Sequence, residues 1–206
     1  MKKIKNSLKK IVSNRYLLFK GKPRDNMIAL TFDDGPHNKY AIDILKILNS
    51  KNIKATFFVI GQKAKDNPDL IRLMAQNNHE VANHSYLHTK NETIEDMKKC
   101  ECIIKDITGG SPRLFRPPWG RITVSRLAYA FFHRIKTILW SFDSMDDKLK
   151  TAQDLKEHIK KSKVSSGDIL LFHDDYKHTV EALPEIIDDL KSRGFIFSTV
   201  SELLRN

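Results

Sequence analysis

The sequence predicts a single α/β domain built around a parallel β-sheet. Strand-like segments alternate with amphipathic, helix-like segments from residue 27 to the C-terminus. The runs 55–60 and 169–172 are apolar almost throughout, as expected for strands that helices cover on both faces. Polar clusters follow several strand-like segments directly, and a chain of 206 residues is long enough for one well-packed domain. We therefore expect the chemistry at the carboxyl ends of the strands.

The alternation defines the expected elements in order. The strands are expected at residues 27–33, 54–60, 79–83, 114–116, 136–141, 168–173 and 195–199. The helices are expected at residues 38–50, 62–77, 91–107, 121–133, 151–162 and 179–193, with a short last helix from Ser201. This pattern places the strand ends on one side of the sheet, but it does not distinguish a closed barrel from an open sheet.

The first strand ends in Thr31-Phe32-Asp33-Asp34-Gly35-Pro36, which leaves two adjacent carboxylates at a strand end. Neighbouring residues of a strand point in opposite directions, so Asp33 and Asp34 need not have the same role. One could bind a metal ion while the other handles a proton. The alternative is an Asx-type turn, because Asp-Gly pairs favour turns for conformational reasons alone.

The third strand is followed by His84-Ser85-Tyr86-Leu87-His88. Two histidines four residues apart can bind one metal ion from the same face of a helical turn, although an exposed polar loop would look similar. Asp34 would supply a third ligand. One carboxylate and two imidazoles suit Zn²⁺ or a similar divalent ion, and they leave positions open for water and substrate.

Two further strand ends carry polar residues. Arg116 precedes Pro117-Pro118-Trp119-Gly120 and could pair with a carboxylate from another strand end, or could be a surface arginine before a turn. His173 ends the sixth strand, where a histidine is often structural. It becomes a general acid if a carboxylate holds one ring nitrogen and keeps the ring protonated.

The net charge of +11 is concentrated at the N-terminus. Residues 1–24 contain nine Lys or Arg and no Asp or Glu, whereas the rest of the chain contains 27 basic and 25 acidic side chains. Residues 1–25 lack the apolar centre of a secretory signal and indicate a basic amphipathic leader. It is either a membrane-surface anchor, contacting anionic lipid through residues 1–20, or an ordinary solvated terminus.

Charge and hydropathy also bear on location and partners. No apolar run is long enough to span a membrane. We therefore expect a cytoplasmic chain, peripheral at the inner membrane face if the leader binds lipid. No nucleic-acid partner is expected, because no basic patch continues into the domain.

Taken together, these motifs resemble the polysaccharide deacetylases of carbohydrate esterase family 4, which share the NodB homology domain. The resemblance covers about residues 26–205, and the motifs occur in the family's order. They are residues 31–36, His84-Ser85-x-x-His88, residues 116–120, Asp143-x-x-Asp146 and residues 171–174. The resemblance implies the family's distorted (β/α)7 barrel, with a leader at residues 1–25 and the NodB homology domain at residues 26–206.

Carried over by position, the resemblance implies a set of catalytic roles. Asp33 would be the general base and Arg116 would orient it. His173 would be the general acid, steered by Asp146. This assignment gives each proton-handling residue a charged partner.

The resemblance also implies the ligands of a metal ion and the residues around the substrate. Asp34, His84 and His88 would bind a divalent cation, first of all Zn²⁺, with Co²⁺, Mn²⁺ and Ni²⁺ as other candidates. The backbone N–H of Trp119 would stabilise the oxyanion. The residues expected around the substrate and the oxyanion are Pro118, Trp119 and Leu171.

Three positions depart from the family's usual pattern. Asp147 stands where a tryptophan is common, and this affects the pocket wall rather than the metal site. Trp119 replaces the more usual tyrosine or phenylalanine. Asn78 occupies a position where glycine is frequent, and asparagine is the next best residue for left-handed backbone.

The function that the resemblance implies is a metal-dependent hydrolase acting on C–N bonds other than peptide bonds. It would remove N-acetyl groups from a polysaccharide, an oligosaccharide or a lipid-linked sugar by attack of a metal-bound water. The alternatives are a deformylase or an O-acetyl esterase on a related glycan, and a catalytically silent carbohydrate-binding domain on the same fold. The complete set of motif residues favours the enzyme over the silent domain.

Overall fold

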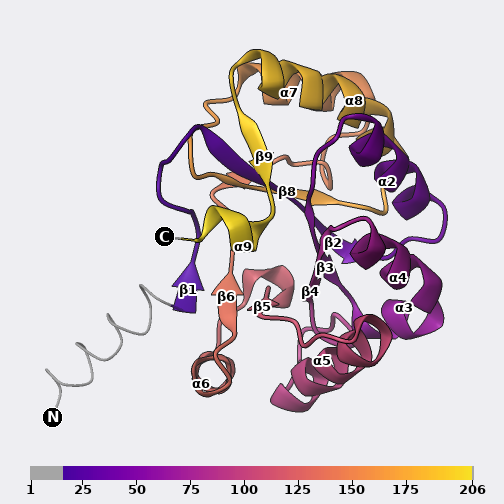
Figure 1. Cartoon of the computed structure of the whole chain (residues 1–206), viewed down its shortest axis with the longest axis vertical. Coiled ribbons are helices and arrows are strands. Elements are labelled where there is room, and N and C mark those ends of the chain that lie inside the picture. Colours follow the sequence, from indigo (N-terminus) through magenta and orange to yellow (C-terminus); the bar gives the residue numbers. More distant parts are fainter. Residues whose placement is uncertain (1–15, 206) are drawn as a thin grey trace, which may run out of the picture.

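The computed structural model describes residues 16–205, which form one parallel β-sheet with helices packed against it (Figure 1). The strands are β1 (Leu17–Leu18), β2 (Met27–Gly35), β3 (Thr56–Val59), β4 (Glu80–Asn83), β5 (Leu114–Phe115), β6 (Lys136–Ile138), β7 (Phe142–Asp143), β8 (Ile169–His173) and β9 (Ile196–Ser198). The helices are α2 (Tyr40–Ser50), α3 (Gly61–Asp66), α4 (Pro68–Gln76), α5 (Ile94–Thr108), η1 (Pro118–Gly120), α6 (Val124–Phe132), α7 (Ala152–Lys161), α8 (Lys177–Ser192) and α9 (Val200–Leu203).

The strands follow the order β1-β6-β5-β4-β3-β2-β8-β7, and β9 pairs with the N-terminal half of β2. Every pairing between these strands is parallel. The sheet curls into a half-barrel with helices along its outer side, and β1 and β7 are the end strands of its order (Figure 1). This arrangement confirms the distorted barrel that the resemblance implies.

The alternation of side chains along β2 separates two hydrophobic layers. Ile28, Leu30 and Phe32 point outward and pack under the helices in the larger core. Ala29 points inward and packs with side chains of the neighbouring strands. Asp33 belongs to the same inward-facing set as Ala29, so the pleat itself directs this carboxylate into the mouth of the half-barrel.

The N-terminal part of the sheet begins earlier than expected. Leu17 and Leu18 pair with β6, and the ammonium group of Lys20 lies 2.8 Å from a carboxylate oxygen of Asp168. The folded domain therefore extends N-terminal to the boundary expected at residue 26. Residues 1–15, which contain most of the proposed leader, lie outside the described residues, and membrane contact stays a prediction. Among residues 16–205, no helix has the length and apolar character needed to cross a bilayer.

Two other differences have local causes. The single helix expected at residues 62–77 is two helices, α3 and α4, which meet at Asn67. Pro68 lacks a backbone N–H and suits the first position of a helix, so it ends one helix and begins the next. Strand β7 was not expected, because two residues are too few to show a hydrophobic period.

Candidate active site

The predicted site residues come together at the carboxyl ends of the strands. They surround an open pocket of about 420 Å³. The residues that line it are Asp33, Asp34, His84, His88, Pro117, Trp119, Gly120, Trp140, Asp143, Asp147, Lys148, Leu171, His173 and Tyr176. Arg116 and Asp146 lie beneath this surface, where each contacts one of the lining residues.

Arg116 holds Asp33 from inside the barrel. Its side chain is fully buried, and one guanidinium nitrogen donates to Asp33 Oδ1 at 2.6 Å and to Thr31 Oγ1 at 2.8 Å. The centre of the guanidinium lies 4.0 Å from the ring centre of Phe58, which keeps the cation in place by stacking. Arg116 is therefore not a surface arginine. It fixes the direction of the Asp33 carboxylate and balances its charge.

Three ligand atoms converge on one point beside Asp33. Nε2 of His84 lies 3.3 Å and Nε2 of His88 lies 3.1 Å from Oδ1 of Asp34. The three atoms are all within 4.8 Å of one another. The other ring nitrogen of His84, Nδ1, donates to the carbonyl oxygen of Arg116 at 2.8 Å, which leaves Nε2 free to bind a metal ion.

The charge state of the cluster also suits a cation. Oδ1 of Asp34 is buried, and among residues 16–205 it faces no polar partner other than the two imidazoles. Burial opposes ionisation of Asp34, but the hydrogen bond and charge of His84, with the charges of His88 and His173, hold its pKa well below its usual range. An ionised carboxylate oxygen facing two imidazole nitrogens is a donor set for Zn²⁺ or a similar divalent ion.

The backbone around the cluster adopts conformations that few residues other than glycine favour. The φ angles are 69° at Asp34, 69° at Ser85, 56° at His88 and 58° at Trp119. Such conformations cost of order 1–3 kcal/mol each and persist where the surrounding structure determines them. The sequence did not reveal these positions, although it did predict left-handed backbone at Asn78, whose φ is 59°.

His173, at the end of β8, is held by Asp146. Its Nδ1 lies 2.7 Å from Oδ1 of Asp146, and its backbone N–H donates to Oδ2 at 2.8 Å. Thr179, which sequence reasoning missed, donates a further hydrogen bond to Asp146 at 2.9 Å. Burial by itself lowers the pKa of His173, but the hydrogen bond and charge of Asp146 outweigh it and raise the pKa to about 9.

This raised pKa predicts the alkaline limb of a pH–rate profile. A general acid must be protonated, so activity that depends on His173 should fall as the pH rises through about 9. In Asp146→Asn the supporting charge is lost, and the limb should move to lower pH. The measurement is kcat against pH for both proteins, with Asp106→Asn on the exposed face of α5 as the control. An unmoved limb in Asp146→Asn would show that His173 is not the titrating acid.

The wall of the pocket contains both aromatic and charged residues. Trp119 is 59% exposed, and its ring centre lies 4.8 Å from that of His88. Trp140 and Tyr176 add aromatic surface that sequence reasoning missed. Asp147 lines the pocket as expected for its position, next to Lys148. Pro118 is buried in the turn η1, and its neighbour Pro117 lines the pocket instead.

The chain is similar to a described protein family and to named bacterial enzymes. A family model for polysaccharide deacetylases matches residues 20–138. A peptidoglycan-N-acetylglucosamine deacetylase of Bacillus cereus is 34% identical, over 96% of this chain and 97% of the relative. The whole length of the chain is thus comparable with that of this relative.

Solved structures share the fold over nearly the same range. The Bc1960 peptidoglycan N-acetylglucosamine deacetylase superimposes with a TM-score of 0.85 at 31% identity, covering 90% of this chain and 91% of that chain. BA3943, described as a pseudoenzyme of carbohydrate esterase family 4 from Bacillus anthracis, gives the same TM-score of 0.85 at 31% identity, covering 91% and 68%. The fold therefore occurs both in a protein named as a deacetylase and in one described as a pseudoenzyme.

Proposed function

The chain belongs to the polysaccharide deacetylase family of carbohydrate esterase family 4, and we propose that it is a metal-dependent enzyme that removes the acetyl group from N-acetylglucosamine units of peptidoglycan. Two kinds of support carry the proposal. The relatives of this chain include peptidoglycan deacetylases over almost its full length. The pocket also holds a complete set of groups for amide hydrolysis.

The observation that carries the chemistry is a pair of supported proton-handling groups on adjacent strands. Asp33 on β2 and His173 on β8 are partners in the strand register. Each has a buried partner, with Arg116 2.6 Å from Asp33 and Asp146 2.7 Å from His173. The site can thus hold an ionised carboxylate and a protonated imidazole together, which are the base and the acid that amide cleavage needs.

Asp34, His84 and His88 would hold the divalent cation. Such an ion supplies Lewis-acid activation of a water molecule and of the substrate carbonyl. The geometry of this chain fits a divalent cation, because the buried Oδ1 of Asp34 and the two Nε2 atoms face one another. Among the described residues, Oδ1 has no other partner.

The remaining steps belong to the chain's own residues. Asp33 accepts the proton of the attacking water, and Arg116 keeps the carboxylate aimed at it. The backbone N–H of Trp119 donates to the oxygen that becomes negative in the transition state, which is often the largest electrostatic contribution. His173 then gives its proton to the departing sugar amine. The exposed ring of Trp119 and the nearby Tyr176 offer apolar faces for the sugar.

The direct test is acetyl release from a panel of glycans. Full-length chain loaded with Zn²⁺ is incubated with peptidoglycan fragments, N-acetylglucosamine oligomers, O-acetylated xylo-oligomers and a lipid-linked N-acetyl sugar. Mass spectrometry should show loss of the acetyl mass from peptidoglycan fragments, and a chelator should abolish it. Loss only from the O-acetylated members would indicate an esterase. No loss from any member, in protein that carries stoichiometric metal, would indicate a deformylase or a silent binding domain like the pseudoenzyme relative.

A further inference from the structure

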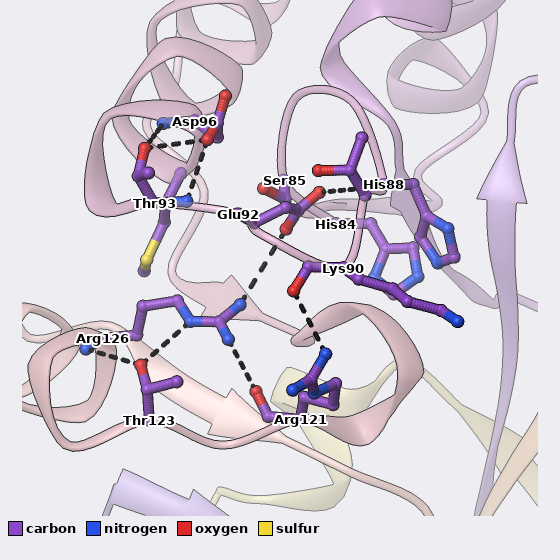
Figure 2. Close-up of polar contacts among 12 residues, drawn as sticks. His84, Ser85, His88, Lys90, Glu92, Thr93, Asp96, Arg121, Thr123 and Arg126 are labelled. Carbon is purple, nitrogen blue, oxygen red and sulfur yellow. Dashed lines mark hydrogen bonds and ion pairs between the residues drawn. The ribbon is translucent and has the colours of Figure 1, made fainter.

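A buried carboxylate lies behind the metal-binding loop and has no place in the chemistry described so far. Glu92 follows the loop that carries His84 and His88, and its side chain is only 1% exposed (Figure 2). One of its oxygens, Oε1, accepts the backbone N–H of Thr89 at 3.1 Å. Thr89 comes directly after His88, so this hydrogen bond fixes the backbone at the exit from a metal ligand.

The loop needs such support. Ser85 and His88 both have left-handed backbone, and conformations of this kind persist only where their surroundings determine them. Ser85 lies beside Glu92 in Figure 2. Burial raises the pKa of Glu92, and the polar contacts of Ser85 and of the Thr89 amide oppose that effect.

Glu92 is itself held in place by the start of α5. Thr93 is the N-cap of this helix and forms a capping box with Asp96, in which each side chain accepts the other's backbone N–H (Figure 2). The capping box fixes the backbone at Thr93, and Glu92 is attached directly before it. The loop is therefore tied to a rigid element rather than to another loop.

Arg126 connects Glu92 to the segment that follows Trp119. Its Nη1 atom lies 3.9 Å from Oε2 of Glu92. This oxygen accepts no hydrogen bond from residues 16–205. The same guanidinium donates to Thr123 Oγ1 at 3.1 Å and to the carbonyl oxygen of Arg121 at 2.9 Å. These two hydrogen bonds to its own loop hold the Arg126 side chain in the orientation in which it faces the Glu92 carboxylate.

A second bridge joins the same two segments. The side chain of Arg121 donates to the carbonyl oxygen of Lys90 at 3.2 Å (Figure 2). Both bridges start from arginines of the segment after Trp119: Arg126 reaches the side chain of Glu92, and Arg121 reaches the backbone two residues before it. Residues 89–92 and 121–126 are therefore held together at two points, next to the contact between the rings of His88 and Trp119.

We propose that Glu92 and Arg126 are a positioning pair that sets the metal ligand His88 and the Trp119 turn relative to each other. Glu92 holds the backbone after His88, and Arg126 ties that backbone to the segment that begins beside Trp119. This inference rests on the proposed metal site. It extends that site to residues outside the motifs shared with the family, and neither residue lines the pocket or belongs to the metal-binding cluster.

The test is the Zn²⁺ affinity of the full chain, measured by competition with a chromogenic chelator. Glu92→Ala removes the acceptor for Thr89 and should weaken Zn²⁺ binding by about 10–100-fold, the usual effect of losing support behind a ligand. Glu92→Gln keeps an amide oxygen that can accept the same N–H, and it should retain most of the affinity. Glu95→Gln is the matched control, because Glu95 lies three residues on, in the first turn of α5, and its side chain is 78% exposed.

A double variant separates positioning from mere stability. Glu92→Ala/Arg126→Met removes both charges, so no unpaired buried charge remains and the fold should be preserved. A positioning role predicts that this folded protein still binds Zn²⁺ about 10–100-fold more weakly than the wild type. Wild-type affinity in the folded double variant would overturn the proposal, whatever Glu92→Ala does alone. Wild-type chain that binds Zn²⁺ but deacetylates nothing would count against the proposed function instead.

Discussion

Replacing Asp33 by asparagine is expected to lower kcat by about 10²–10⁴-fold, the contribution of a well-placed general base. The substitution keeps the shape of the side chain and an oxygen that can accept the hydrogen bond from Arg116. It removes the charge that accepts the proton of water. Asp34, His84 and His88 are untouched, so metal content should stay at the wild-type level. The measurements are kcat on the best substrate of the panel and metal per chain by elemental analysis.

The control for this variant is Asp106→Asn, which removes a carboxylate from the exposed surface of α5. It should leave both kcat and metal content unchanged. A folded, metal-loaded Asp33→Asn protein with near-normal kcat would show that another group acts as the base. Loss of metal in this variant would also contradict the assignment of Asp33 as the base and Asp34 as the metal ligand.

Replacing Arg116 by methionine is expected to lower the free energy of unfolding by about 3–5 kcal/mol, as in other buried ion pairs that lose one partner. Arg116 is fully buried, and the Asp33 side chain is only 5% exposed. Removing the guanidinium leaves the carboxylate inside the barrel without its positive partner. Urea unfolding of the metal-free protein measures the effect without a contribution from the metal site. Activity should fall as well, because the base is no longer aimed.

Two variants identify the cause of that loss. Arg113→Met alters an exposed arginine just before β5 and should change the unfolding free energy little. The double variant Asp33→Asn/Arg116→Met removes both charges and should recover much of the stability lost in Arg116→Met, because no unpaired charge remains. Equal losses in the single and double variants would show that packing around Phe58, rather than charge, accounts for the cost.

The strand ends explain why so much of the site was predictable. A parallel sheet brings the carboxyl ends of its strands to one edge, whatever the exact order of the strands. Asp33, His84, Arg116 and His173 each follow or end such a strand, so the alternation of elements was enough to gather them. Their residue types then indicated the chemistry, because an aspartate with two histidines is a set of metal ligands.

Other features of the structure could not be predicted from the sequence, and each has a physical reason. Strands β1 and β7 contain two residues each, and so short a segment shows no hydrophobic period. The break between α3 and α4 was signalled by Pro68, yet the amphipathic pattern continued across it. Burial of Arg116 could not be read from its neighbours in the chain, because it depends on Thr31 of β2, Phe58 of β3 and Leu139 just after β6.

By itself, the sequence determined the class of fold, the edge of the sheet that carries the site, and the donor atoms available there. These follow from local periodicity and from residue type, which act over a few positions of the chain. Only the tertiary structure decided which charges pair, which side chains are buried and how the ligand loop is supported. Glu92 contacts Arg126 across 34 residues of sequence, and His88 has left-handed backbone in the loop that precedes Glu92. Contacts of this kind depend on packing between segments, and no local pattern encodes them.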